Sequence, residues 1–331
     1  MDHCHELYMH AVSLNQHKAR RTQTSKPISE RTIRDKLAMY NRNVSPVIGS
    51  RYIGSIVQRD LTDIIIAMSA RAPVQANRTG SELNVFFSWC CGLRGQEKGI
   101  DLARNPADVL GDLWNPETPG DRWFDENELP LFLRALAGEE RLYRRALLMK
   151  LLTGCRFSEV MAAPMSEFRD GMWIIPGLRT KNGQEHPIVL GPWGRKLAET
   201  NESWLVPSPK LDDGPMVWGW PKIMKRIRQR MEAISGGDVE HFTPHDLRRT
   251  MRSHVEDHGI DEITAERMVN HLPSGLIKIY NRNKRAAAMA DGFAKWDAAL
   301  AQIAIKAGVA EALEAPTTMV EIPATPQLHP A

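Results

Sequence analysis

Cysteine is scarce in this sequence, with four in 331 residues at positions 4, 90, 91 and 155. Their spacing does not resemble a disulfide framework, and the adjacent Cys90 and Cys91 could hardly share one structural bridge. Long apolar runs are also absent, because none approaches the roughly 20 residues that a membrane span requires. The first residues lack the apolar core of a signal peptide. We therefore expect a soluble, cytoplasmic protein without a membrane partner.

A strong excess of either charge is missing too, because 43 basic side chains face 40 acidic ones. The distribution is uneven, however: residues 1–110 hold 15 Lys and Arg against 10 Asp and Glu. A basic block of this kind is a weak indication of a polyanionic partner. The length exceeds what one hydrophobic core usually organises, so we expect two domains.

Helical periodicity dominates the chain, with one interruption. Apolar residues recur at helical spacing from Ser29 to about Asp108, which predicts a bundle of about four helices. The pattern changes between Met172 and Leu190, where two apolar runs flank Asn182-Gly183, a favourable tight turn. The predicted fold class is therefore mainly α with a small antiparallel β-hairpin or sheet (α+β).

Proline and glycine punctuation predicts the boundaries of the domains. Pro116, Pro119 and Gly120 lie close together, as in a linker. The last residues are rich in proline, which indicates disorder. We divide the chain into a partly helical N-terminal segment (1–28), a helical domain (29–112), a linker (113–122), a second domain (123–300), and a helix end with a disordered tail (301–331).

Two short motifs present side chains that suit a phosphodiester. His245 and Arg248 are three residues apart behind Pro244, so one helix face would carry both. A guanidinium binds two phosphate oxygens, and an imidazole can hold or pass a proton. Arg156 follows a Thr-Gly-Cys turn, and Glu159 lies one helical turn further on. Taken singly, the first motif is more often an ordinary exposed helix face, and the second could be a buried structural ion pair.

An ordered series of six residues favours the functional interpretation: Arg156, Lys181, His245, Arg248, His271 and Tyr280. The series resembles the tyrosine recombinases, in particular the integrases of temperate phages and integrative elements. In that family the first arginine stands in a Thr-Gly-x-Arg-x-x-Glu context, the lysine follows Thr on a hairpin, and a His-x-x-Arg box comes next. The second histidine precedes the tyrosine by nine residues, as here.

The resemblance extends to the N-terminal half and has two departures. Asn77-Arg78 through Trp89, together with Asn105-Pro106, look like the family's helical core-binding domain, so residues 123–300 would be the catalytic domain. Val269-Asn270 replaces the usual Leu-Gly before the second histidine. Phe157-Ser158 follows the first arginine, where the family often has a small residue and then Gly or Ser. Neither departure removes a reacting group.

The resemblance implies a site-specific DNA recombinase, an enzyme that cleaves and rejoins DNA through a 3′-phosphotyrosine intermediate at Tyr280. The reaction would integrate or excise a mobile element. Because transesterification conserves bond energy, we expect no cofactor and no metal. The implied partners are double-stranded DNA with specific attachment sites, further copies in a synaptic tetramer on DNA, and accessory DNA-bending or directionality factors. Bound to DNA, the protein would be associated with the nucleoid.

The same resemblance assigns roles to the remaining residues. Arg156 and Arg248 would neutralise charge on the non-bridging phosphate oxygens, with Glu159 orienting the first of them. Lys181 would be the general acid for the departing 5′-oxygen. His245 would be a base or proton relay. His271 would donate a hydrogen bond to the phosphate.

Several interpretations stay open at this point. A basic helical cluster and one N-terminal arginine could contact DNA or simply be solvated: Lys222, Lys225, Arg226, Arg228, Arg230 and Arg78. An apolar stripe on the last helix (Phe293, Trp296, Leu300 and Ile303) either packs on its own domain or docks into a neighbouring protomer. A type IB topoisomerase-like enzyme and a non-catalytic DNA-binding regulator derived from a recombinase are the competing functions.

Overall fold

The computed structural model describes residues 1–18, 27–118, 120–271 and 285–317 of the chain. Two compact units, Met1–Pro119 and Gly120–Ala331, each enclose a hydrophobic core of their own. The division falls inside the segment 113–122, where we expected a linker. Within the described ranges, no helix combines the length and the apolar character needed to cross a bilayer.

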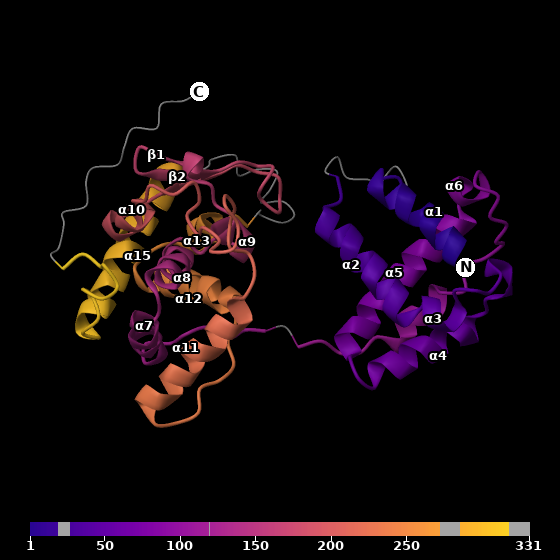
Figure 1. Cartoon of the computed structure of the whole chain (residues 1–331), viewed down its shortest axis with the longest axis horizontal. Helices are drawn as coiled ribbons and strands as arrows, with labels where there is room; N and C mark the ends of the chain where they lie inside the picture. The colour runs from indigo at the N-terminus through magenta and orange to yellow at the C-terminus, as the bar shows by residue number, and fades with distance from the viewer. Residues whose placement is uncertain (19–26, 119, 272–284, 318–331) are drawn as a thin grey trace. The chain divides into compact units, whose positions relative to one another are not determined.

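The first unit is helical and is built around one long helix. Its elements are α1 (Asp2–Ser13), α2 (Glu30–Asn43), α3 (Ser45–Ile48), α4 (Gln58–Ser69), α5 (Pro73–Cys91) and α6 (Leu93–Gln96), with 3-10 turns at Ile53–Ser55 and Asp108–Leu113. Helix α5 runs through the middle of this unit, and α1, α2, α4 and α6 all contact it (Figure 1). The ring of His5 on α1 stacks on that of Tyr40 on α2, with centroids 3.5 Å apart. The N-terminal residues therefore contribute to the core of this unit.

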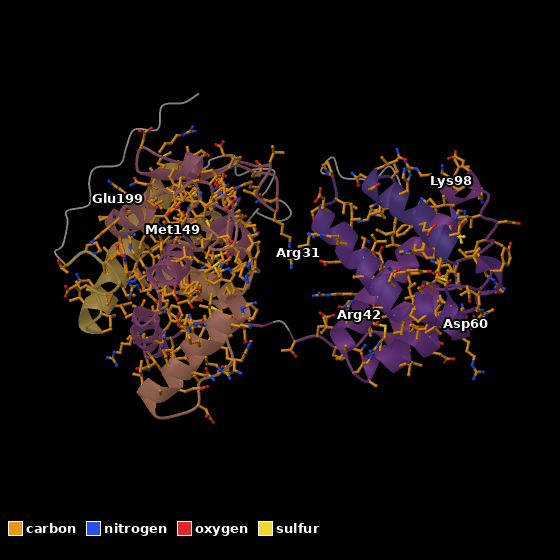
Figure 2. The ribbon with its side chains drawn as sticks, in the orientation of Figure 1. Arg31, Arg42, Asp60, Lys98, Met149 and Glu199 are labelled. Atoms are coloured by element: carbon orange, nitrogen blue, oxygen red, sulfur yellow. The ribbon has the colours of Figure 1, made fainter. Side chains whose placement is uncertain are left out.

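The second unit combines helices with a small sheet. Its helices are α7 (Glu128–Ala137), α8 (Arg141–Thr153), α9 (Phe157–Met161), α10 (Pro192–Ala198), α11 (Trp220–Ser235), α12 (Pro244–Asp257), α13 (Glu262–Met268) and α15 (Ala286–Lys306), and its strands are β1 (Phe168–Arg169), β2 (Met172–Ile175) and β3 (His186–Val189). Helix α8 lies at the centre, in contact with α12, α10 and α15. Figure 2 shows one of its residues, Met149, among densely packed side chains, in agreement with its complete burial.

The sheet is antiparallel with the strand order β1-β2-β3, and Trp173 pairs with Ile188 across its central pair. The predicted hairpin is therefore present, and the mainly helical fold class is confirmed. A turn does lie at Asn182-Gly183, where the N–H of Gly183 donates to the carbonyl of Thr180 at 3.4 Å and Gly183 has a φ of +78°. It does not join the strands directly, because their pairing already ends at Ile175 and His186. Thr180 holds the intervening loop, because its single O–H lies within hydrogen-bonding distance of two carbonyls, that of Gly177 at 3.0 Å and that of Gln184 at 2.8 Å.

The apolar stripe on α15 packs inside its own unit. Trp296 and Leu300 are fully buried, and the indole N–H of Trp296 donates to the carbonyl of Leu151 at 2.9 Å. The carboxylate of Asp297 accepts the backbone N–H groups of Trp193 and Gly194, at 3.1 and 3.0 Å. The first interpretation of this stripe is therefore confirmed. Docking of the stripe into a neighbouring protomer would require these side chains to leave this core first, and it stays a prediction.

Candidate active site

The start of α12 fixes the positions of His245 and Arg248. Thr243 caps the helix by accepting the N–H of His245 at 3.3 Å, and Asp246 accepts the N–H of Thr243 at 2.7 Å. This reciprocal capping, together with Pro244 in the first turn, begins the helix where the sequence predicts it. The two functional side chains differ in exposure, since that of His245 is exposed and that of Arg248 is buried.

Arg248 is a buried cation that contacts neutral groups. Its guanidinium donates to the carbonyl oxygen of Gly154 at 2.7 Å and to that of Val269. Among the described carboxylates, none forms an ion pair with it. Burial, and then the charge of Arg156, lower the pKa of Arg248 to about 10, so it stays protonated at neutral pH. A buried positive charge without a bridging carboxylate favours the approach of an anion.

Gly154 can offer its carbonyl oxygen to Arg248 because it ends α8 in the left-handed conformation, with φ of +62°. A β-carbon at this position would lie 2.9 Å from the sulfur of Met251 and 2.9 Å from a methyl group of Val269. Glycine therefore satisfies both the backbone conformation and the close packing.

Arg156 stands at the start of α9 and is held by Glu159. The carboxylate accepts the backbone N–H of Arg156 at 2.7 Å and its guanidinium at 3.0 Å. Glu159 is buried, with 1% of its side chain exposed, whereas 21% of the Arg156 side chain is exposed. The contact fits the predicted orienting role of Glu159, which stays a prediction.

His271 is held from behind by a carboxylate. Its Nδ1 lies 2.6 Å from Glu266, which also accepts the guanidinium of Arg252 at 2.7 Å. Burial outweighs this carboxylate and lowers the pKa of His271, as do the charges of Arg248 and Arg156. With Nδ1–H directed at Glu266, Nε2 can donate only in the imidazolium form. The predicted donor role therefore requires a protonated ring, which a bound phosphate would favour.

Asn270 explains the departure from the usual Leu-Gly. Its φ of +53° is left-handed, a region that Asn tolerates better than most residues other than Gly. The side-chain amide of Asn182 donates to its carbonyl at 3.0 Å and to its side-chain oxygen at 2.8 Å. Arg156 donates to the same carbonyl at 3.3 Å. Sequence reasoning missed this pair, although an Asn in a position usually held by Gly was a signal.

Lys181 precedes Asn182 in the loop between β2 and β3. Its side chain is exposed and makes no ion pair or hydrogen bond with a described residue. Because the neighbouring Asn182 is bonded to Asn270, Lys181 stays close to the segment that leads to His271. Tyr280 lies outside the described residues.

Lys150 is a fully buried lysine close to the site that the sequence analysis did not single out. Its amine donates to the carbonyl of Cys155 at 2.7 Å, and no part of the residue is exposed. Burial, and then the charge of Arg248, lower the pKa of Lys150 to about 7. The surrounding leucines of α8 indicate a buried apolar helix, and nothing in the sequence marks this lysine as different from an ordinary exposed one.

Lys150→Met is expected to flatten the pH dependence of the free energy of unfolding. The unfolded chain binds this proton up to a pKa near 10.4, whereas the folded protein releases it above about pH 7. Over that window, stability therefore rises with pH by up to about 1.4 kcal/mol per unit. Urea unfolding between about pH 6.5 and about pH 9.5 measures the slope. Leu148→Met is the control for packing, and equal slopes in wild type and Lys150→Met would contradict the assignment.

The five basic residues of α11 do not form one surface. Arg226 and Arg230 both bind Glu139, which is buried, with an Arg230–Glu139 distance of 2.5 Å. Arg228 pairs with Glu232 on its own helix at 3.4 Å. Lys222 and Lys225 are exposed and pair with none of the described carboxylates. These two lysines are therefore the members of the cluster that are free to meet a polyanion.

In the first unit, Arg78 lies on the exposed face of α5. It lines a hollow of about 620 Å³ together with Arg42 and Arg71. Figure 2 labels Arg42 on this unit, and the side chains of Arg42 and Arg78 are exposed.

No group of three or more His, Cys, Asp or Glu in the described part of the chain could hold a metal ion.

Comparison with known proteins identifies the family. The sequence profile of the phage integrase family matches residues 122–286, which include all six predicted catalytic residues. The chain belongs to the phage integrase family. Of the curated relatives described below, one is named a tyrosine recombinase and the other a prophage integrase.

Two curated relatives of this integrase-family chain are only distantly similar. Tyrosine recombinase XerD of Yersinia pestis is 26% identical over 166 residues, which are 46% of this chain and 51% of XerD. Prophage integrase IntZ of Escherichia coli K12 is 22% identical over 253 residues, or 73% of this chain and 59% of IntZ. The match to XerD thus spans about half the length of that relative.

Solved structures show the same fold as this integrase-family chain. A lambda integrase dimer bound to a COC′ core site superposes with a TM-score of 0.62 at 14% identity, covering 86% of this chain and 96% of that one. A lambda integrase tetramer bound to a Holliday junction gives a TM-score of 0.59 at 14% identity, covering 86% and 77%. At such low identity the likeness establishes the fold alone.

Proposed function

We propose that this protein is a site-specific DNA recombinase that cleaves and rejoins DNA through a 3′-phosphotyrosine at Tyr280. The observation that carries the proposal is the pair of arginines at the centre of the site. Arg248 is buried against neutral carbonyls, and Arg156 is held by Glu159 with its guanidinium partly exposed. The pair leaves positive charge available for one bound phosphate.

The electrostatic part of the mechanism rests on these two side chains. As the tyrosine oxygen attacks phosphorus, negative charge collects on the non-bridging oxygens, and preorganised guanidinium groups stabilise it. Their positions are fixed before substrate binds, since Glu159 holds one and the carbonyl oxygens of Gly154 and Val269 hold the other. Little reorganisation is then required during the reaction.

Two side chains transfer protons in this proposal, and a third donates a hydrogen bond. Although part of the His245 ring is exposed, burial of the rest and neighbouring positive charges, Arg249 first among them, lower the pKa of His245 to about 4. Its imidazole is therefore neutral at pH 7 and can accept the proton of the tyrosine phenol. Lys181 protonates the departing 5′-oxygen, and His271 donates a hydrogen bond to the phosphate when it is protonated.

The partners follow from the same proposal. The lambda integrase structures contain DNA, as a core site in one case and as a Holliday junction in the other. We extend this to double-stranded DNA with specific attachment sites and to a tetramer on DNA, with accessory DNA-bending or directionality factors. Lys222, Lys225 and Arg78 are the candidate contacts to the DNA backbone. The biological reaction would be integration or excision of a mobile element, with the protein associated with the nucleoid.

The experiment that tests the proposal has two steps. The protein first selects its binding site from a library of random duplexes. A nicked version of the selected site is then incubated with the protein, so that cleavage releases a short fragment and traps the covalent complex. A protein–DNA adduct that resists denaturation supports the recombinase chemistry. Specific binding without any adduct would favour the non-catalytic regulator. Relaxation of supercoiled DNA lacking the site would favour a topoisomerase.

Asn182→Ala is expected to slow adduct formation by about 10-fold, because it removes the hydrogen bonds that tie the lysine loop, the segment between β2 and β3 that carries Lys181, to Asn270. Gln184→Ala, which removes an exposed side chain from the same loop, is the control. Rates are measured on the nicked substrate at saturating protein. A similar loss in both variants would mean that the loop tolerates neither change and that the Asn182–Asn270 contact has no special role.

A further inference from the structure

An apolar pocket of about 690 Å³ opens in the second unit beside His245. It lies between the beginning of α11 and the segment that leads into α12. Trp218, Trp220 and Phe242 line it, together with Phe157 at the start of α9. The proposed mechanism uses none of these four aromatic residues.

The pocket adjoins the phosphate-binding arginines through the chain itself. Phe157 directly follows Arg156, and His245 lies one helical turn before Arg248. A phosphodiester held by the two arginines would carry its neighbouring nucleoside toward this opening. The position therefore suits a part of the DNA that is covalently attached to the reacting phosphate.

The inner wall is rigid and apolar. The rings of Trp220 and Phe157 pack edge to face with centroids 5.7 Å apart, and the indole N–H of Trp220 already donates to the carbonyl of Met216 at 3.0 Å. Phe242 is buried and packs edge to face on Phe124, with centroids 4.9 Å apart. A phosphate would gain little there, whereas the flat face of a base would be well accommodated.

The rim is polar and cationic. Trp218 is 38% exposed, and its indole N–H bonds to no described residue. Lys225 also lines the opening and pairs with no described carboxylate. An aromatic interior with a positive rim complements a nucleotide, whose base is apolar on its faces and whose phosphate is negative.

We propose that this pocket receives the unstacked base of a nucleotide next to the cleaved phosphodiester, with Trp218 stacking on it. The inference rests on the proposed function. Removing a base from the stack loosens the strand end that must leave one duplex and enter another. The pocket would thus bind the substrate in a distorted form that favours strand exchange.

A cycle of two changes tests the inference, one in the protein and one in the DNA. Dissociation constants are measured for the selected duplex and for versions with an abasic residue at each position in turn. All proteins carry Tyr280→Phe, so that binding is read without cleavage. We expect Trp218→Ala to weaken binding to the intact site about 5- to 100-fold. When the abasic residue is at one particular position beside the cleaved phosphate, the dissociation constants of the proteins with and without Trp218→Ala should agree within about twofold.

Trp123→Ala is the matched control, because Trp123 is also 38% exposed but does not line the pocket. Its effect should be the same on intact and abasic DNA. If Trp218→Ala weakens binding equally to the intact DNA and to every abasic DNA, or does not weaken it at all, the base-binding role is overturned. The proposed recombinase function is tested separately, by the covalent adduct. A change in self-association without DNA would instead assign the pocket to a second copy of the chain. Failure to select any DNA site would overturn both proposals.

Discussion

Tyr280→Phe is expected to abolish the covalent protein–DNA adduct and to leave the affinity for the selected DNA within about twofold. Phenylalanine keeps the ring but has no oxygen to attack phosphorus, so the loss should be at least about 1000-fold. Binding should persist because the arginines that hold the phosphate are unchanged. The nicked substrate measures the adduct on a denaturing gel, and fluorescence anisotropy measures the affinity.

Tyr52→Phe is a suitable control, because the Tyr52 side chain is 71% exposed in the first unit. It should form the adduct at the wild-type rate. An adduct that persists in Tyr280→Phe would show that another side chain is the nucleophile. Loss of both binding and adduct would indicate that Tyr280 supports the fold of the site, and its assignment as the nucleophile would then lack support.

Lys181→Ala is expected to slow cleavage by about 10²- to 10⁴-fold, the usual contribution of a positioned general acid. The defect should nearly vanish on DNA in which sulfur replaces the bridging 5′-oxygen at the cleaved position. A thiol has a pKa near 8.5, far below that of an alcohol, so the departing thiolate needs no proton. Single-turnover rates on the two substrates give the comparison.

The sulfur substrate separates proton donation from positioning. Arg156→Ala should be slow on both substrates, because it removes charge stabilisation rather than a proton. Lys210→Ala, which alters another exposed lysine of the second unit, should be normal on both. If Lys181→Ala were equally slow on the oxygen and sulfur substrates, the general acid would have to be another group.

The sequence predicted those parts of the site that depend on local structure. A capped helix start and a three-residue spacing place His245 and Arg248 on one helix, and a glycine that must be left-handed brings Arg156 close by. Each of these is set within a few residues of the chain. The roles of these side chains, and the position of Tyr280, remain predictions.

Features that depend on tertiary contacts could not be predicted. The α11 cluster looked uniform in sequence, but Glu139, far away in the chain, binds Arg226 and Arg230. The length of the lysine loop depends on hydrogen bonds of Thr180, which spacing alone does not reveal.

The carbonyl oxygen of Asn270 accepts hydrogen bonds from two separate parts of the chain, the guanidinium of Arg156 and the amide of Asn182. Moving this single peptide group would remove one contact of Arg156, which Glu159 still holds, and a contact of the loop between β2 and β3 at the same time. The residues that follow it in sequence lead to Tyr280. Assembly of the site should therefore be cooperative, because a shift in this stretch of backbone would disturb the position of one arginine and of the general-acid lysine together.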